Sequence, residues 1–222
     1  MVHSLLAFLI LTFLISGSIA DCDEESCEIM AAPWIDTFRN HLKKNPMSAG
    51  TLSLATVEQG KPRVRTVLFQ GIVEKDGKSG IAIKTSRESR KIRNSDSTSV
   101  ECCFWLQETM VQFRLSGNMV YGEDELERKR VWNSLNSAAR SQFFYSGGLD
   151  ESTSGLRFQE EQEEVSKRGL QVIPDSFMVG VLYPDEIDFL DLGTLERRHW
   201  MKNEDMSWTV KQGYAPPVVS TV

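Results

Sequence analysis

Three basic side chains in the first half of the sequence could together bind a phosphate group. Arg65 begins the apolar stretch RTVLFQG, and Arg90 and Lys91 end the polar stretch TSRESRK. Thr85 and Glu88 have the Ser/Thr-x-x-Glu spacing of a capping box, which predicts that a helix begins there, directly after a strand. Free backbone N–H groups at such a helix start also favour an anion. The alternative, that these are ordinary solvent-exposed cations, stays open at this point.

A second polar row lies on the stretch VQFRLSGNMVY. Val111 and Phe113 alternate with Gln112 and Arg114, so a strand here has one apolar and one polar face. Gln112 can both donate and accept hydrogen bonds, which suits the edge of a heterocycle. The polar face is either the lining of a ligand groove or a plain solvent face.

Other kinds of site have little support in the sequence. It contains no Gly-x-Gly-x-x-Gly, no P-loop, no Cys-x-x-Cys and no Gly-x-Ser-x-Gly elbow. His3, His41 and His199 are too scattered to predict a metal site. Charged residues make up 25% of the chain and the formal net charge is −6, which argues against a nucleic-acid partner. A few local cations can still bind a small phosphorylated molecule.

The elements that must position these residues are mostly short strands. Trp34, Phe38 and Leu42 predict an amphipathic helix over 34–45 that ends before Pro46. Five apolar stretches follow, separated by turn residues: TLSLATV, RVRTVLFQGIV, GIAIKT, SVECCFWL and VQFRLSGNMVY. Strands with almost no helix between them predict an antiparallel meander that closes into a barrel. Trp34, Trp105 and Trp132 are expected in the core rather than against a ligand.

The second half adds helices and a few strands. A helix is predicted over 123–142, a loop over 146–155 and a solvated, charged helix over 158–168. FMVGVLYP and EIDFLDLG predict two further strands, and a last strand is expected near 208–210. With 222 residues the chain is long enough for one sizeable core.

The N-terminal region leaves the compartment open. Residues 1–20 resemble a signal peptide: an apolar run is followed by small residues, although a short membrane anchor is the alternative and no stable membrane span is expected. An acidic spacer covers 21–31, where Cys22 and Cys27 could pair. Cys102 and Cys103 are adjacent on a strand, so a bridge between them would be strained. A start at Met30 would instead give a cytosolic protein.

The order RTVLFQG, IKTSRESRK and CFWLQETMVQFRLSG resembles the pyridoxamine 5′-phosphate oxidase family of split-barrel flavoproteins. The resemblance is greatest to the family's Alr4036-type FMN-binding branch, which PWIDTF, LATV and YPDEIDFLDLG also fit, so it covers about residues 32–217. It implies an α+β fold: an antiparallel split β-barrel that binds FMN, with flanking helices. It also implies a homodimer, because the family binds FMN across a dimer interface.

The resemblance also assigns FMN contacts. Arg65, Arg90 and Lys91 would hold the phosphate, and Gln112 would bond the edge of the isoalloxazine ring. The remaining implied cofactor contacts are Thr66, Val67, Leu68, Gln70, Lys84 and Thr85.

The resemblance to the family's substrate residues is weaker. Arg197 and His199 in ERRHW match an Arg-x-His pattern that lies beside the substrate, and Ser141 matches a substrate-binding serine. The best-known oxidases have a lysine at the position of Gln70, and an arginine and a tyrosine at Ser137 and Asn133. The leading hypothesis is an oxidase of pyridoxamine or pyridoxine 5′-phosphate that transfers a hydride to FMN and then reduces dioxygen. An FMN-dependent reductase acting on another small substrate and a non-catalytic flavin-binding protein are the alternatives.

Overall fold

The computed structural model describes residues 32–93, 95–144 and 172–214, which form four helices and eight strands. The helices are α1 (Ile35–Lys44), α2 (Arg90–Arg93), α3 (Glu125–Ser134) and α4 (Ser137–Ser141). The strands are β1 (Thr51–Glu58), β2 (Lys61–Lys75), β3 (Lys78–Ser86), β4 (Ser99–Leu106), β5 (Val111–Tyr121), β6 (Phe177–Asp191), β7 (Glu196–Lys202) and β8 (Trp208–Tyr214).

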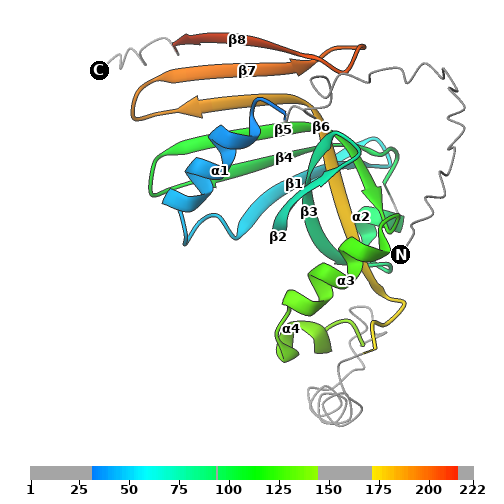
Figure 1. Cartoon of the computed structure of the whole chain (residues 1–222). Coiled ribbons are helices and arrows are strands. Elements are labelled where there is room, and N and C mark those ends of the chain that lie inside the picture. The colour runs from blue at the N-terminus through cyan, green and yellow to red at the C-terminus, as the bar shows by residue number, and fades with distance from the viewer. Residues whose placement is uncertain (1–31, 94, 145–171, 215–222) are drawn as a thin grey trace, which may run out of the picture.

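Six of the strands form a closed ring. Their order is β3-β2-β1-β4-β5-β6, and β3 also pairs with β6, so that each of these strands has two antiparallel neighbours. β7 and β8 extend the sheet beyond β6 and lie at the top in Figure 1. The predicted fold class, an α+β protein built on an antiparallel split β-barrel with flanking helices, is confirmed.

β6 connects the ring to the extension because its two halves have different partners. Residues 177–182 pair with β3, whereas residues 186–190 pair with β7, and β5 runs beside both halves. A register shift between Ser116 and Gly117 of β5 lies opposite Pro184, which has no N–H to donate. A Cβ on Gly117 would lie 2.2 Å from the carbonyl oxygen of Tyr183, so only glycine fits there. The prediction of two separate strands here is wrong, because the pairing with β5 continues across the proline.

The ring encloses an aromatic core. The alternating strands place Leu54, Phe104 and Phe113 inside, and α1 covers the core with Phe38, whose ring centroid lies 5.0 Å from those of Phe104 and Phe113. A second buried cluster, which includes Trp132, packs α3 against the outer side of β3 and β6. The core was therefore predictable from the alternation of the strands.

The three tryptophans do not share one environment. Trp34 and Trp132 are fully buried, as predicted, but Trp105 is 43% exposed, and its prediction as a core residue is wrong. Trp105 occupies an outward position of β4, between the buried Phe104 and Leu106. The alternation of side chains along a strand decides its exposure.

The predicted helix over 123–142 is two helices. α3 ends where Leu135 takes an extended conformation, and the Asn136 side chain then caps α4 by accepting from the backbone N–H of Ala139 at 2.8 Å. An asparagine at this position favours a new N-cap over continuation of the helix. β7 was not predicted as a strand, and β8 extends to Tyr214, beyond the expected 208–210.

Several sequence predictions concern residues outside the described ranges. These are the signal-peptide-like segment, the spacer with Cys22 and Cys27, the loop over 146–155 and the helix over 158–168. Within the described residues, Cys102 and Cys103 are both free, as their adjacency on β4 predicted. None of the helices described is long and apolar enough to cross a membrane.

Candidate functional site

A pocket of about 300 Å³ lies where the end of the β1–β2 hairpin meets the segment around α2. Its lining consists of Glu58, Arg63, Val64, Arg65, Ser89, Arg90 and Lys91. Four of these side chains are cationic and one is acidic. The three cations predicted to bind a phosphate are thus brought together, although β2 and α2 are separated in the sequence by β3. The seven lining residues together form the cationic pocket.

Arg65 is held from several sides. Its Nη1 donates to the hydroxyl of Thr56 at 2.7 Å and to the carbonyl oxygen of Leu54 at 3.3 Å, and its Nη2 donates to Glu58 at 2.7 Å. Arg65 faces Leu54 across the β1–β2 pair, on the inward side of the ring. Fixed guanidinium groups suit phosphate because they present N–H donors in a planar fork.

Lys91 is a half-buried cation of the pocket. Its Nζ donates to Thr85 Oγ1 and to Ser89 Oγ, both at 2.6 Å. Burial, together with the nearby positive charge of Arg65, lowers the pKa of Lys91 to about 8. An incoming anion would relieve both effects, because it offsets the lost hydration and the repulsion from Arg65.

Thr85 contributes differently from the prediction. It belongs to β3 rather than to a capping box, and α2 begins only at Arg90 and has four residues. The backbone N–H of Glu88 is bonded to the hydroxyl of Ser86 at 3.2 Å. The predicted helix start at this position is wrong, and the helix is too short for a dipole argument. The pocket therefore depends on side chains, with Thr85 orienting Lys91.

A second group of polar side chains lies on the outward face of β5, β6 and β7. The register places Gln112 beside Leu190 and Leu190 beside Arg197, so these three positions share one face. Arg197 donates to both carboxylate oxygens of Asp188, at 2.8 and 2.9 Å, and Arg114 donates to the same carboxylate. Burial opposes ionisation of Asp188, but the bonds from Arg197 and Arg114 outweigh it and lower the pKa of this carboxyl.

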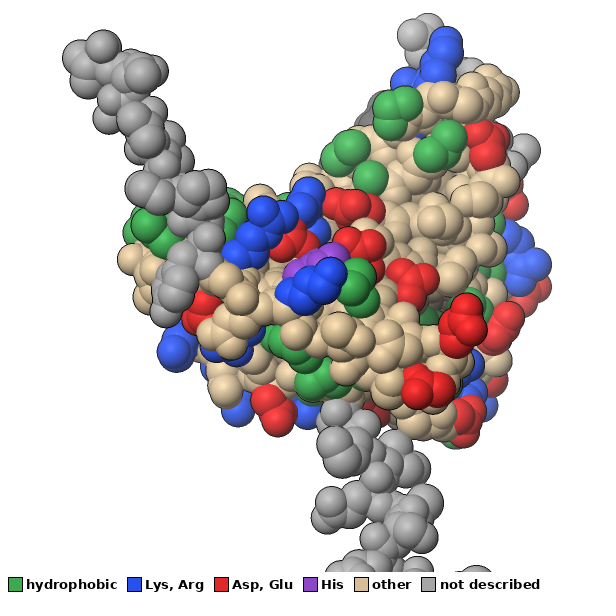
Figure 2. Space-filling model, turned by 90° about the horizontal axis from the view of Figure 1, so that it is seen from above, with side chains coloured by type: hydrophobic (Ala, Val, Ile, Leu, Met, Phe, Trp, Pro, Cys, Tyr) green, Lys and Arg blue, Asp and Glu red, His purple; other side chains and the backbone are tan. Residues whose placement is uncertain are grey.

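His199 lies on the same outward face and is paired with an acid. Its Nε2 is 2.7 Å from a carboxylate oxygen of Glu186. Seen from above, the side on which β7 and β8 lie in Figure 1, basic and acidic side chains lie beside one another on the surface (Figure 2). The predicted substrate residues Arg197 and His199 thus each contact an acidic side chain of the same chain, Asp188 and Glu186.

The remaining predicted site residues are spread over several environments. Thr66 and Leu68 point outward from β2, whereas Val67 is buried in the core. Lys84 is half-buried on β3, and its pKa is lowered by burial. Ser141 is buried in α4, where its hydroxyl donates to the carbonyl oxygen of Ala138 at 2.9 Å. Its role in substrate binding stays a prediction.

Gln70 is bonded locally. Its side-chain amide donates to the backbone carbonyl oxygen of Phe69 at 2.9 Å. The backbone carbonyl oxygen of Gln70 accepts from Arg130 at 2.9 Å. Arg130 lies on α3, where it also donates to the buried Glu127, so its bond to Gln70 connects β2 to α3. Its contact with FMN stays a prediction.

The sequence analysis missed four residues of the cationic pocket, Glu58, Arg63, Val64 and Ser89. Glu58 could have been found, because it continues the inward row of Leu52, Leu54 and Thr56 along β1. An acidic residue at an inward position of an alternating strand needs a partner. Ser89 gives no such signal, because it lies in a turn whose path depends on tertiary packing.

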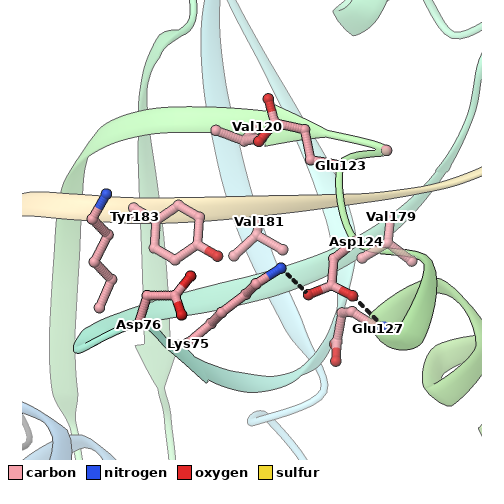
Figure 3. A pocket seen from close by; sticks show the side chains of 11 residues that line it. Lys75, Asp76, Val120, Glu123, Asp124, Glu127, Val179, Val181 and Tyr183 are labelled. Carbon is pink, nitrogen blue, oxygen red and sulfur yellow. Dashed lines mark hydrogen bonds and ion pairs between the residues drawn. The ribbon is translucent and has the colours of Figure 1, made fainter.

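A second pocket, of about 240 Å³, lies on the α3 side of β6 and contains none of the predicted site residues. Val179, Val181 and Tyr183 form its floor, and Lys75 reaches across it to Asp124 at 2.8 Å (Figure 3). Asp124 also caps α3 by accepting from two backbone N–H groups. The ion pair therefore anchors the β2–β3 hairpin to the start of α3.

Residues 31–122 match the family model described as "Pyridoxamine 5′-phosphate oxidase, FMN-binding domain". The matched region spans β1 to β5 and contains the whole cationic pocket. This part of the chain is therefore an FMN-binding domain of the pyridoxamine 5′-phosphate oxidase family, and FMN is the cofactor of that domain. The predicted family and cofactor are confirmed.

One protein relative and two solved structures are also similar to this chain. The uncharacterized protein YGR017W of Saccharomyces cerevisiae is 33% identical in a region covering 39% of this chain and 35% of the yeast protein. A pyridoxamine 5′-phosphate oxidase-related, FMN-binding protein of Nostoc punctiforme superposes with a TM-score of 0.72 at 24% identity, over 84% of this chain and all of that chain. PhzG of Burkholderia lata, solved in complex with tetrahydrophenazine-1-carboxylic acid, gives 0.69 at 21% identity, over 90% of this chain and all of that chain. At these identities the two structures show a shared fold.

The chemistry of the cationic pocket fits the phosphate end of FMN. Four cationic side chains face one carboxylate, which leaves an excess of positive charge for a phosphate dianion. The hydroxyl of Tyr121 is also buried without a hydrogen-bond partner, and the charge of Arg65 acts on it. The pocket thus has more hydrogen-bond donors than acceptors, as a site for an anion requires.

Proposed function

We propose that this protein is an FMN-dependent oxidoreductase of the pyridoxamine 5′-phosphate oxidase type that acts on a small phosphorylated substrate. The observation that carries the proposal is the convergence of Arg65, Arg90 and Lys91 in one pocket of an FMN-binding domain. When bound, FMN would supply the redox chemistry, taking a hydride from the substrate and passing the electrons to dioxygen. The chain's own residues would bind and orient both molecules.

The predicted roles divide between the two faces of the sheet. The cationic pocket would hold the FMN phosphate on the inward side of the ring, with Arg65 fixed by Thr56. Gln112, on the outward face of β5, would bond the edge of the ring system. Further contacts are proposed for Thr66, Val67, Leu68, Gln70, Lys84 and Thr85.

We propose Arg197 and His199 as substrate-positioning residues, with Ser141 as a helper. Arg197 and Arg65 lie on opposite faces of the sheet, so a single chain does not bring them to one point. A homodimer resolves this difficulty if the second copy supplies its own outward face. The phosphorylated substrate would then meet guanidinium groups from both copies.

The outward face of β1, β2 and β4 supports such a dimer. Val64 and Leu68 of β2 are 69% and 46% exposed, and Trp105 of β4 lies beside Gln112 on the same face. Neighbouring exposed apolar side chains of this size mark protein interfaces. We expect the wild-type protein to have a dimer mass in light scattering and Trp105→Asp, at a 43% exposed position of this face outside the cationic pocket, to be monomeric. Leu126→Asp, at a 79% exposed position on α3, is the matched control and should stay dimeric.

The test of cofactor binding is a titration of the purified protein with FMN, followed by its visible absorption spectrum. Arg65→Gln should weaken FMN binding at least about tenfold, since it removes charge-assisted hydrogen bonds. Arg39→Gln is the matched control, because Arg39 pairs with Glu74 at 3.0 Å on α1 and should leave the affinity unchanged. Failure of the wild-type protein to bind FMN would refute the proposal.

The test of the reaction is anaerobic addition of pyridoxamine 5′-phosphate to the FMN-loaded protein. Bleaching of the flavin, restored by air with formation of peroxide, is expected for an oxidase. A flavin that stays oxidised with this amine but is reduced by another donor would favour an FMN-dependent reductase. That second candidate is supported by Gln70 in place of the family's lysine and by the pairing of Arg197 with Asp188. A flavin that no donor reduces would indicate a non-catalytic flavin-binding protein.

A further inference from the structure

Glu58 is an acid inside a pocket that is otherwise lined by cations. It is the last residue of β1, on the inward face beside Thr56, and its side chain is only 5% exposed. One carboxylate oxygen accepts from Nη2 of Arg65 at 2.7 Å, and the other accepts from Nη2 of Arg90 at 3.2 Å. Nε of Arg63 lies 3.8 Å from the second oxygen.

These contacts draw the cations toward an internal anion. Both oxygens of Glu58 are engaged by guanidinium groups that would also face a phosphate in the pocket. A carboxylate at this depth is stable only because it is paired, so Glu58 depends on the arginines. Arg65 does not depend on Glu58 in the same way, because it also donates to Thr56 Oγ1, Leu54 O and Arg63 O.

We infer that Glu58 is an internal anion that competes with the phosphate of the ligand for Arg65 and Arg90 and thereby limits the affinity of the cationic pocket. This inference rests on the proposed function of the pocket as the phosphate site of FMN. It has two consequences of opposite sign. Without the Glu58 charge, the flavin-free protein loses stability because its cations repel one another. The same change strengthens phosphate binding, since no internal anion has to be displaced.

A purely structural role for Glu58 would give a different pattern. If the carboxylate were needed to hold the arginines in place, its removal would lower both the stability and the affinity. Glu127 offers the matched control: it is also buried and pairs with Arg130 at 2.5 Å, but it lies on α3, away from the cationic pocket. Removal of its charge should affect stability alone.

The experiment compares Glu58→Gln and Glu127→Gln in the full-length protein. FMN affinity is measured by flavin fluorescence, and the midpoint of thermal unfolding is measured without ligand, with riboflavin and with inorganic phosphate. We expect Glu58→Gln to bind FMN about fivefold more tightly, the effect of a single partly screened charge. Its ligand-free unfolding midpoint should fall, and riboflavin binding, which involves no phosphate, should not change. Glu127→Gln should lower the midpoint and leave FMN affinity as in the wild type.

Unchanged or weaker FMN binding by Glu58→Gln would overturn the inference and leave the proposed function standing. If Glu58→Gln does not fold, Glu58→Asp replaces it. The shorter side chain withdraws the carboxylate from Arg90, so tighter binding by a smaller factor supports the inference and unchanged or weaker binding overturns it. If the wild-type protein does not bind FMN, the proposed function fails. The inference then depends on inorganic phosphate: a larger rise in the unfolding midpoint of Glu58→Gln supports it, and an equal or smaller rise overturns it.

Discussion

Raising the pH from about 7 to about 9 is expected to weaken FMN binding, because the ammonium group of Lys91 loses its proton in the flavin-free protein over this range. Burial and the charge of Arg65 lower the pKa of Lys91 to about 8. A bound phosphate favours the charged lysine and raises this pKa. Between the two pKa values, binding therefore requires uptake of a proton, and the affinity falls as the pH rises.

The size of the effect follows from the fraction of charged lysine. With a pKa of about 8, Lys91 is roughly nine-tenths protonated near pH 7 and roughly one-tenth protonated near pH 9. If the flavin-bound form stays protonated throughout, the dissociation constant rises about tenfold across this range. Folding stability of the flavin-free protein has the opposite slope. Unfolded Lys91 has an ordinary pKa of 10.5, so the unfolded chain binds more protons from about 8 to 10.5 and stability rises with pH there.

The assay is fluorescence titration with FMN at a series of pH values for the wild type and two variants. Lys91→Arg keeps the positive charge but does not titrate in this range, so its affinity should be independent of pH. Lys91→Met should bind FMN weakly at every pH, close to the wild type at the alkaline end. A wild-type affinity that does not change with pH, or a slope that persists in Lys91→Arg, would refute the reasoning.

Three further perturbations have expected outcomes. Thr56→Val removes the hydroxyl that accepts from Arg65. In the same titration it should weaken FMN binding about fivefold, because one hydrogen bond to a charged group is lost. An unchanged affinity would mean that Arg65 does not contact the ligand. Asp124→Ala removes the N-cap of α3 and should lower the free energy of unfolding by ~1 kcal/mol in urea denaturation, with FMN affinity unaltered. Asp188→Asn should lower the free energy of unfolding by ~1 kcal/mol near neutral pH, a value reduced because its arginine partners are half exposed. Since the folded-state pKa of Asp188 is depressed, the wild-type advantage should be present above its unfolded pKa and disappear as the pH falls through the folded value.

The strands were predictable because their signal is local. Alternation in TLSLATV and VQFRLSGNMVY reports directly which side chains point inward, and β1 and β5 begin at the expected residues. The continuous β6 was not predictable in the same way. A proline followed by two acidic residues normally ends a strand. β6 continues past Pro184 only because it pairs with β5 on both sides of this proline.

The sequence predicted three of the residues that form the cationic pocket, but not how the fold brings them together. Arg65, Arg90 and Lys91 do converge, but the reason given from sequence, a capped helix start after Thr85, is wrong. The cations converge because β2 and the segment after β3 meet at the same end of the ring. Such a meeting depends on strand pairing between distant segments, which a capping pattern does not report.

The arrangement of the two polar groups constrains how the site can work. Side chains directly opposite one another in an antiparallel pair point to the same face, so the pairing of Arg65 with Leu54 fixes Arg65 on the inward side. The chain of pairings from Gln112 through Leu190 to Arg197 fixes those residues on the outward side, where Trp105 is exposed. No change of side-chain rotamer moves a residue through a closed sheet. A ligand that contacts both groups must therefore either pass round the end of the ring or lie between two copies of the chain. The mass of Trp105→Asp in solution, measured with its FMN affinity, separates the two, because Trp105 is exposed on the outward face and does not line the cationic pocket. Monomers that bind FMN as tightly as the wild type require the first arrangement, and monomers with weakened binding require the second.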